Sequence, residues 1–378
     1  MKSTTLRRTE RDSRMELLRI LLMYMIAFVH TIGLGGLLNG AAPFSKTYFA
    51  LWWLEGMGCV STNAFVILSG YYMIHSRLTA KKVVRLWMQV FFYAVGCYLV
   101  MSLLGKRPIT WDTIHVYLFP IVNEKYWFIT GYMGVFLLSP ALNAMIGAMD
   151  RKAHFLLVVT LLILFSVLPC LFGRLNVMGI TDGYGLTWML VLYILGAYLR
   201  KYPVWEKGRV FPCLLIWVLC AAVYPVSRFI VHALVEAGHA KTSDLGWLCM
   251  RNSIFCLIGS VSLFMAFRRL RELPAKLGRF VCRVSPMVFG VYLLHTHPYV
   301  GNALWKRLNL SQYLHTPTIW LVIPLVALAI LLAGLLVDAL RQLLFRPLEE
   351  SAGFDRFCSA LGRLFRLEWL YRLLEPKQ

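Results

Sequence analysis

Charged side chains are scarce in this sequence of 378 residues, and acidic ones are the scarcest of all. Only 15% of the residues are charged, and 18 Asp and Glu stand against 39 Lys and Arg. Soluble domains carry roughly 25% charged residues and few long apolar runs. Because 59% of this chain is hydrophobic, its composition excludes an ordinary soluble domain and indicates that a lipid bilayer surrounds most of it.

Metal-ligand and disulfide patterns are also missing. The nine cysteines are odd in number, lie mostly within apolar runs, and show neither a C-x-x-C motif nor a Cys/His ligand spacing. We therefore expect no metal site and no disulfide framework. The first apolar run is longer than the hydrophobic region of a signal peptide and lacks a small-residue cleavage site, so we expect an uncleaved first span.

Long apolar runs separated by short loops occupy nearly the whole chain, without a soluble domain, an internal repeat or a low-complexity segment. The sequence predicts an all-α fold, a polytopic integral membrane helical bundle of about ten transmembrane helices. The predicted spans are residues 15–37, 56–74, 86–104, 126–146, 154–172, 186–199, 210–231, 253–267, 284–303 and 318–340.

The net charge of +21 is high enough for a nucleic-acid-binding protein, but its distribution favours a different explanation. With the N-terminus in the cytoplasm, 29 of the 39 Lys and Arg residues fall on the inner side of the predicted spans. Inner loops of membrane proteins carry this excess of positive charge. We therefore predict that both termini are cytoplasmic and expect no nucleic-acid partner.

Residues 346–378 follow the last span, and we predict that they form a cytoplasmic amphipathic tail. In the stretch FDRFCSALGRLFRLEWLYRLL, apolar side chains recur at helical spacing with arginines between them. A helix lying on the inner leaflet, with membrane lipid as its partner, has this pattern. A helix packed on the protein's own cytoplasmic face has it too.

Two ionisable residues bound the apolar stretch RILLMYMIAFVH in the first span. Arg19 and His30 are eleven residues apart, close to three helical turns, so their side chains share one helix face. The rise between them is about 16 Å, which places Arg19 near the cytoplasmic surface and His30 near mid-membrane. Glu16 lies on the same stripe and can pair with Arg19. An ionisable group at the depth of His30 is a functional candidate. The alternatives are a snorkelling anchor for Arg19 and an interhelical hydrogen bond for His30.

Five further motifs follow in order along the chain. They are FVILSGYYM (65–73), KKVVR (81–85), YWFITGYMGVFLLSPALN (126–143), LTWMLVLYILGAYLRKY (186–202) and FGVYLLHTHP (289–298). Together with the Arg19 and His30 pair, they make the chain resemble the membrane acyltransferase-3 family, integral membrane enzymes that O-acylate cell-surface carbohydrates. The resemblance covers about residues 15–345. We expect residues 1–345 to form an acyltransferase-3-like transmembrane domain, with Lys82 replacing the first arginine of a basic family motif.

The resemblance implies transfer of an acyl group, expected to be acetyl, from cytosolic acetyl-CoA to a hydroxyl of an exopolysaccharide or another cell-envelope glycan. We interpret His30 as the catalytic base that takes the hydroxyl proton, and Arg19 as a catalytic residue that orients the donor. Lys82 and Arg85 lie three residues apart at the cytoplasmic start of the third span, where they can hold CoA phosphates. Positive-inside anchoring is the alternative for this pair.

The candidate acceptor-binding residues lie in three spans. The acceptor is expected to be a cell-surface glycan or a lipid-linked sugar. Helix packing is the alternative for Ser69, and an aromatic belt is the alternative for Tyr126 and Trp127. The candidate residues are Asn63, Ser69, Tyr126, Trp127 and His295. The sequence does not identify the carboxylate that orients His30, so His297, Asp182 and Glu124 are reserve candidates.

The expected location is the bacterial plasma membrane, as a multi-pass protein. Two other function classes fit a polytopic bundle with polar groups in its spans. A glycan transporter or flippase more often shows two related halves, which this sequence lacks. A non-catalytic membrane partner of a polysaccharide assembly complex would keep the fold without needing both Arg19 and His30.

Overall fold

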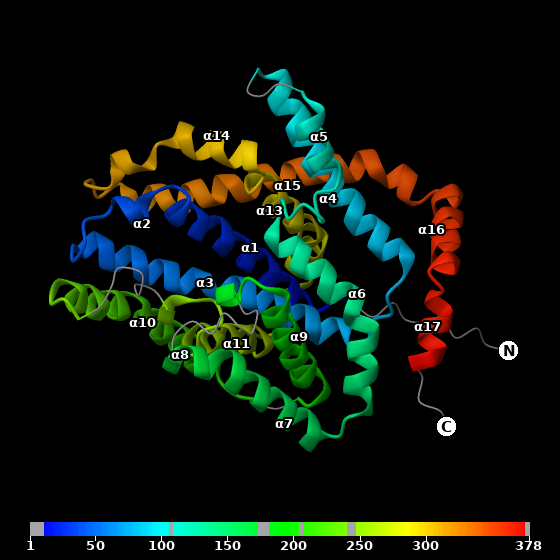
Figure 1. The fold of residues 1–378 in the computed structure, drawn as a ribbon, viewed down its shortest axis with the longest axis horizontal. Helices are drawn as coiled ribbons and strands as arrows, with labels where there is room; N and C mark the ends of the chain where they lie inside the picture. The colour runs from blue at the N-terminus through cyan, green and yellow to red at the C-terminus, as the bar shows by residue number, and fades with distance from the viewer. Residues whose placement is uncertain (1–10, 106–108, 173–180, 204–206, 240–246, 375–378) are drawn as a thin grey trace.

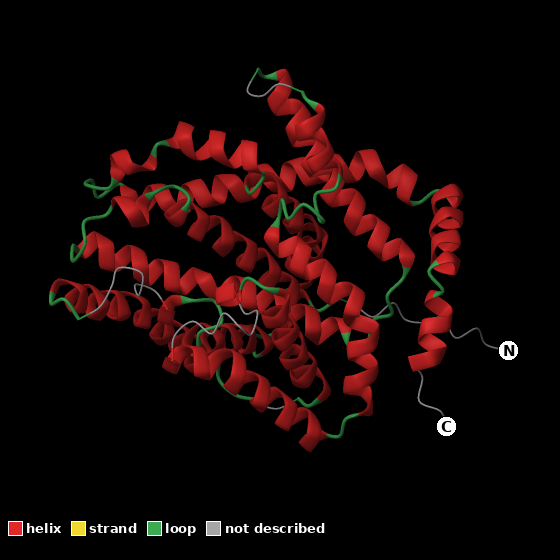
Figure 2. Ribbon diagram, viewed as in Figure 1, coloured by secondary structure: helices red, strands yellow, loops and turns green. Residues whose placement is uncertain are grey.

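The computed structural model describes residues 11–105, 109–172, 181–203, 207–239 and 247–374. Within these ranges every regular element is a helix and no strand occurs (Figure 2). Helices are the open-ended structures that satisfy all their backbone groups inside lipid. Most of the long helices run in a similar direction through one bundle (Figure 1). The predicted all-α membrane bundle is confirmed.

Eight helical segments in the described ranges are long and apolar enough to cross a membrane. They are α1 with α2 (Ser13–Gly40), α3 (Lys46–Met73), α4 (Ala80–Leu103), α6 (Trp127–Ala148), α7 with α8 (Arg151–Phe172), α10 (Val210–Glu236), α12 with α13 (Ala275–His295) and α15 (Ile319–Glu349). Within the joined spans, the separate helices are α1 (Ser13–Gly33), α2 (Leu37–Gly40), α7 (Arg151–Leu162), α8 (Leu168–Phe172), α12 (Ala275–Val284) and α13 (Val288–His295). The other helices are α5 (Trp111–Leu118), α9 (Leu186–Lys201), α11 (Ile254–Arg268), α14 (Pro298–Leu308), α16 (Ala352–Leu364) and α17 (Leu367–Leu374).

Two of the ten predicted spans, α9 and α11, are shorter than the roughly 20 residues that cross a bilayer. The chain before each of them enters the bundle as a loop. The Arg251 backbone N–H donates to the Asp182 carbonyl (3.2 Å), and the buried Asn63 amide donates to the Arg251 carbonyl (2.7 Å). Non-helical backbone at membrane depth is tolerated where protein buries it or where it lines a cavity. These loops therefore give the bundle a protein-lined interior next to α3.

The close approach of α3 and α9 depends on two glycines. A Cβ atom on Gly70 would lie 2.2 Å from the Tyr193 carbonyl oxygen, and one on Gly196 would lie 2.1 Å from the Ile67 carbonyl oxygen. Small residues let two membrane helices pack backbone to backbone. The glycine of the SGYYM stretch is therefore a packing residue, and it holds α3 against the middle of the bundle.

The ninth predicted span needs a correction. The structure has a helical segment over Ala275–His295 instead of one over 284–303, and a new helix, α14, begins at Pro298. His297 caps α14, since its Nδ1 accepts the Tyr299 backbone N–H (3.3 Å) while its Nε2 lies 3.2 Å from the Ala94 carbonyl oxygen. Burial lowers the pKa of His297 to about 4. His297 is thus a neutral structural residue, separated from His295 by a helix end.

The tail helices α16 and α17 turn across the end of the bundle (Figure 1). Phe354 and Cys358 are buried, and Asp355 forms an ion pair with Lys81 near the start of α4. One face of the tail therefore packs on the protein itself. Other apolar side chains of α16 remain open, since Phe357 and Leu364 are 55% and 73% exposed.

Both ends of the described chain meet the same end of the bundle. Asp12, just before α1, forms an ion pair with Arg268 (3.0 Å), and Arg268 lies over the ring of Tyr71 near the end of α3. The tail contacts Lys81, a few residues further along the chain. Residues 1–10 and 375–378 lie outside the described ranges.

Reporter fusions are expected to place this shared end in the cytoplasm. Fusions after Lys152 and Lys207 should report an inner location, and fusions within 108–124 or 233–250 an outer one, because 29 of the 39 basic residues then lie inside. The measurement is a paired set of reporters, one active only inside and one active only outside. The opposite pattern would also remove Lys82 and Arg85 from the side on which CoA is found.

Candidate active site

His30 and His295 are brought together by the ends of two helices. His30 lies in the last turn of α1 and His295 is the last residue of α13. The Nδ1 atom of His30 is 2.8 Å from the Nε2 atom of His295, and His295 is 2% exposed. The helix places His30 about 26 Å from the start of α1 at Ser13, and the joined span of α1 and α2 continues to Gly40.

The hydrogen-bond partners define which nitrogen of His30 is basic. The Nδ1 atom of His295 lies 2.5 Å from the Val291 carbonyl oxygen, and a carbonyl only accepts, so His295 carries its proton on Nδ1. Its Nε2 lone pair then accepts the Nδ1–H of His30. In neutral His30 this leaves the Nε2 lone pair available to take a proton.

A small cavity of about 60 Å³ lies beside His30. A space of this size holds a few water-sized groups. Apart from His30, the side chains from α1, α6 and α13 are apolar or aromatic, whereas α3 and the loop before α11 contribute most of the polar ones. The residues that line it are Met23, Ile26, Val29, His30, Cys59, Ser61, Thr62, Phe65, Trp127, Phe128, Arg251, Val288, Phe289 and Tyr292.

Arg251 is the cation of this cavity, and sequence reasoning missed it. Its guanidinium donates to the Tyr184 hydroxyl and lies 4.2 Å from the Tyr184 ring and 5.9 Å from the Trp127 ring. The Trp127 and Tyr184 rings pack edge to face with centroids 4.6 Å apart. Trp127 therefore faces the interior of the bundle. A residue of an aromatic belt would instead lie at the membrane–water interface.

Tyr126 also points inward. It is 2% exposed and its ring lies 6.2 Å from that of Tyr292, in the core between α6 and α13. Its hydroxyl is one of the buried polar atoms without a hydrogen-bond partner in the described residues. Tyr126 does not line the cavity beside His30, but it packs against Tyr292, which does.

Arg19 lies at the other end of α1. Its guanidinium is 3.2 Å from a carboxylate oxygen of Glu16, which confirms the predicted pair, and the Ser285 hydroxyl donates to the same carboxylate. The guanidinium is also 5.6 Å from the Tyr72 ring centroid. Three helical turns separate Arg19 from His30, and Arg19 is not part of the cavity wall beside His30.

Asn63 and Ser69 are bonded within the bundle. The Asn63 side chain donates to the Arg251 carbonyl and accepts from the Trp188 indole N–H (3.0 Å), so it fixes the loop of Arg251 against α3 and α9. Ser69 donates to the Phe65 carbonyl of its own helix (2.9 Å). Asn63 thus positions one wall of the site.

The structure does not favour either reserve carboxylate as a partner of His30. Glu124 is exposed in a turn with φ of 50°. Asp182 lies in the loop before α9, and its carbonyl oxygen accepts the backbone N–H of Arg251. The partner that the structure gives to His30 is another imidazole, that of His295.

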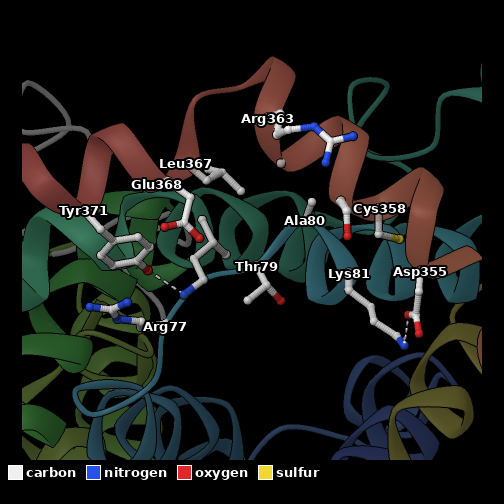
Figure 3. A pocket seen from close by; sticks show the side chains of 13 residues that line it. Arg77, Thr79, Ala80, Lys81, Asp355, Cys358, Arg363, Leu367, Glu368 and Tyr371 are labelled. Atoms are coloured by element: carbon white, nitrogen blue, oxygen red, sulfur yellow. Dashed lines mark hydrogen bonds and ion pairs between the residues drawn. The ribbon is translucent and has the colours of Figure 1, made fainter.

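A second and larger cavity, of about 600 Å³, lies at the other end of the bundle (Figure 3). One wall is the segment before and at the start of α4, including Arg77 and Lys81, and the other is the tail, including Arg363. The Tyr371 hydroxyl accepts the Leu78 backbone N–H (2.6 Å) and closes one side.

Lys82 and Arg85 lie next to this second cavity but do not line it. The Lys82 ammonium donates to the Ser76 hydroxyl (2.6 Å) and to the Arg77 carbonyl (2.7 Å). Arg85 forms an ion pair with Glu349 at the end of α15 (3.0 Å). In this conformation Arg85 holds α4 against the end of α15, and Lys82 is bonded to the segment just before α4. The cations that line the cavity are Arg77, Lys81 and Arg363.

The described residues contain no group of three or more His, Cys, Asp or Glu side chains that could hold a metal ion. In the comparisons with known proteins, the family model of the acyltransferase domain matches residues 12–338, which include both histidines of the pair and all of α3. No curated protein and no solved structure matches the chain.

Proposed function

The chain belongs to this acyltransferase family, and on that premise we propose that it transfers an acetyl group from cytosolic acetyl-CoA to a hydroxyl of an exopolysaccharide or another envelope glycan, in the bacterial plasma membrane. The observation that carries the proposal is the pair of histidines. An imidazole with an available Nε2 lone pair, beside a small cavity within a membrane acyltransferase domain, suits removal of a hydroxyl proton.

The proposed reaction begins at the Nε2 atom of His30. This atom takes the proton of the sugar hydroxyl as the hydroxyl oxygen attacks the thioester carbonyl carbon. The tetrahedral intermediate then breaks its carbon–sulfur bond, and His30 gives the proton to the departing thiolate. His295 accepts the Nδ1–H of His30 throughout, so it fixes the orientation of the ring and stabilises the imidazolium.

Arg251 stabilises the negative charge that develops on the thioester carbonyl oxygen during the attack. Its guanidinium is fixed by Tyr184 and lines the same cavity as His30. A cation held in place before the reaction stabilises an oxyanion with little reorganisation. Arg19 lies three turns towards the cytoplasm, along the course that an extended pantetheine arm would follow from the inner surface to His30.

The proposed donor site is the cytoplasmic end of α4. The cations Lys82 and Arg85 lie there, beside the cavity lined by Arg77, Lys81 and Arg363. CoA phosphates would compete for cations that now pair with carboxylates, as Arg85 does with Glu349. The open apolar side chains of α16 and its arginines suit contact with the inner leaflet, and we place the tail there.

Arg85 and Glu349 offer a matched test of the donor site. Arg85→Ala is expected to raise the KM for acetyl-CoA about tenfold or more, because a charge-assisted hydrogen bond contributes roughly 1.5–3 kcal/mol, while the KM for the glycan stays unchanged. Glu349→Gln breaks the same ion pair but keeps the cation, so it should leave the KM for acetyl-CoA equal or lower. If both variants raise this KM alike, the ion pair matters only for the fold, and Arg85 is an anchor.

Radiolabelled acetyl-CoA separates the proposed enzyme from the other function classes. Membrane vesicles that contain the protein and the glycan should incorporate label into the glycan as an alkali-labile ester. A transporter would move glycan without consuming acetyl-CoA, and a non-catalytic partner would do neither. Wild-type vesicles that leave the glycan unlabelled, although it is present, would overturn the proposed function.

A further inference from the structure

One face of α3 carries polar and aromatic side chains where a membrane helix usually has aliphatic ones. Tyr48, Trp52, Glu55 and Cys59 follow each other at spacings of four, three and four residues, so they form one stripe along the helix. We call these four residues the α3 polar face. It begins near the helix start at Lys46, on the predicted outer side, and runs into the membrane-spanning part.

The α3 polar face is covered by α10. The Tyr48 hydroxyl is 2.8 Å from the Nε2 atom of His232, and the Arg228 guanidinium lies 3.7 Å from the centroid of the Trp52 ring. Arg228, His232 and Trp52 are all partly accessible. The contact between α3 and α10 is therefore lined by polar groups, and Glu55 is partly accessible as well.

Several polar atoms on this face have no partner. Among the described residues, Glu55 Oε2, Trp52 Nε1 and Arg228 Nε are buried without a hydrogen bond. The other oxygen of Glu55 accepts from the Cys59 thiol (3.2 Å), which is a weak donor. A carboxylate within a membrane span costs free energy unless it has a partner or a function. Water alone can fill such a site, but the combination of acceptor and donors suits a ligand with many hydroxyl groups.

The α3 polar face ends at the cavity of His30. Cys59 belongs to the cavity wall together with His30. The two helices touch at this level, since a Cβ atom on Gly58 would lie 2.2 Å from the Val29 side chain. Arg251 lines the same cavity as His30 and Cys59. The α3 polar face therefore leads from the start of α3 to the wall of the cavity that contains the His30 imidazole.

We propose that the α3 polar face, together with Arg228, binds the sugar units of the acceptor glycan and directs one hydroxyl to His30. Glu55 accepts hydrogen bonds from sugar hydroxyls, and Arg228 and Trp52 donate to sugar oxygens. The inference deepens the proposed function and rests on it, because it assigns the acceptor side of the same reaction. Glu55 binds the acceptor and takes no part in proton transfer.

The test measures the two substrates separately. Right-side-out vesicles are loaded with radiolabelled acetyl-CoA, and the probe added outside is glycan purified from a strain that lacks this protein. Glu55→Gln is expected to raise the KM for the glycan about tenfold or more, which is the loss of one hydrogen bond to a charged group. The KM for acetyl-CoA and the turnover at saturating glycan should stay within about twofold of wild type. Trp52→Phe removes one donor and should raise the same KM by a smaller factor.

Glu236→Gln is the matched control, since Glu236 is an exposed carboxylate at the outer end of α10. It should leave both KM values unchanged. If Glu55 only stabilises the fold, Glu55→Gln should instead have a lower melting temperature and an unchanged KM for the glycan. That result, with wild-type vesicles active, overturns the inference alone. Wild-type vesicles that transfer no label overturn the proposed function and the inference with it.

Discussion

His30→Ala is expected to lower the turnover of acyl transfer by about 10²–10⁴-fold, the range that general-base catalysis contributes. The variant removes the Nε2 lone pair that takes the hydroxyl proton, while Arg251 and the helices around the cavity remain. One imidazole in a bundle of this size contributes little to stability, so the protein should insert in normal amounts. The loss should fall on kcat, with the KM for acetyl-CoA retained. The measurement is labelled acetyl transfer per amount of inserted protein.

Two controls separate chemistry from packing. Val29→His in the His30→Ala background moves the imidazole about 100° around α1, so it should not restore activity. His154 is a fully buried histidine on α7, bonded to the Ile194 carbonyl (3.2 Å) and outside the cavity wall. His154→Ala should keep the turnover of the folded protein. Near-wild-type acylation by well-inserted His30→Ala would reduce the histidine pair to a packing contact.

His295→Ala is expected to have the second-largest effect, a loss of turnover between about 10² and 10⁴-fold. Loss of the group that fixes the tautomer and orientation of a catalytic histidine costs up to about 10⁴-fold in a serine protease. Here the Nε2 lone pair of His295 is the acceptor for the Nδ1–H of His30. Without it, His30 is free to rotate and to present the wrong nitrogen to the substrate.

The choice of replacement identifies His295 as a positioning residue. His295→Gln supplies an amide oxygen that can accept the same N–H, so it should recover part of the turnover. His295→Met has a similar length but accepts weakly, so it should behave like His295→Ala. The melting temperature should not follow this order. Equal losses for Gln and Met at position 295, in step with stability, would show that the side chain only fills space.

The sequence predicts those features of the site that depend on helix periodicity. The spacing of Arg19 and His30 places both on one face of α1, and the pair of Arg19 with Glu16 follows from a separation of three residues. The residue type and position also indicate His295, through the family motif. Its role as the partner of His30 does not follow from any spacing, because it requires α1 and α13 to end side by side.

Other features depend on tertiary structure or on a helix boundary. Arg251 enters the site because its loop folds back into the bundle, for which the sequence carries no periodic signal. The end of α13 did have a signal, since Pro298 is a helix breaker just after the two histidines. The residues of the α3 polar face also recur at helical spacing in the sequence. Placing the start of the second span at 56 excluded Tyr48, Trp52 and Glu55, whereas α3 begins at Lys46.

The central claim is that this chain moves an acyl group from a cytosolic thioester to an outer hydroxyl, and a sealed two-compartment assay tests it most directly. The purified protein is inserted into liposomes with radiolabelled acetyl-CoA on the side of Lys152 and Lys207 and purified glycan only on the other side. Wild-type protein is expected to place alkali-labile label on the glycan, and His30→Ala about 10²–10⁴-fold less. Transfer across the membrane is contradicted if label appears only when both substrates are on the same side. The role of His30 is contradicted if wild-type protein and His30→Ala give equal label.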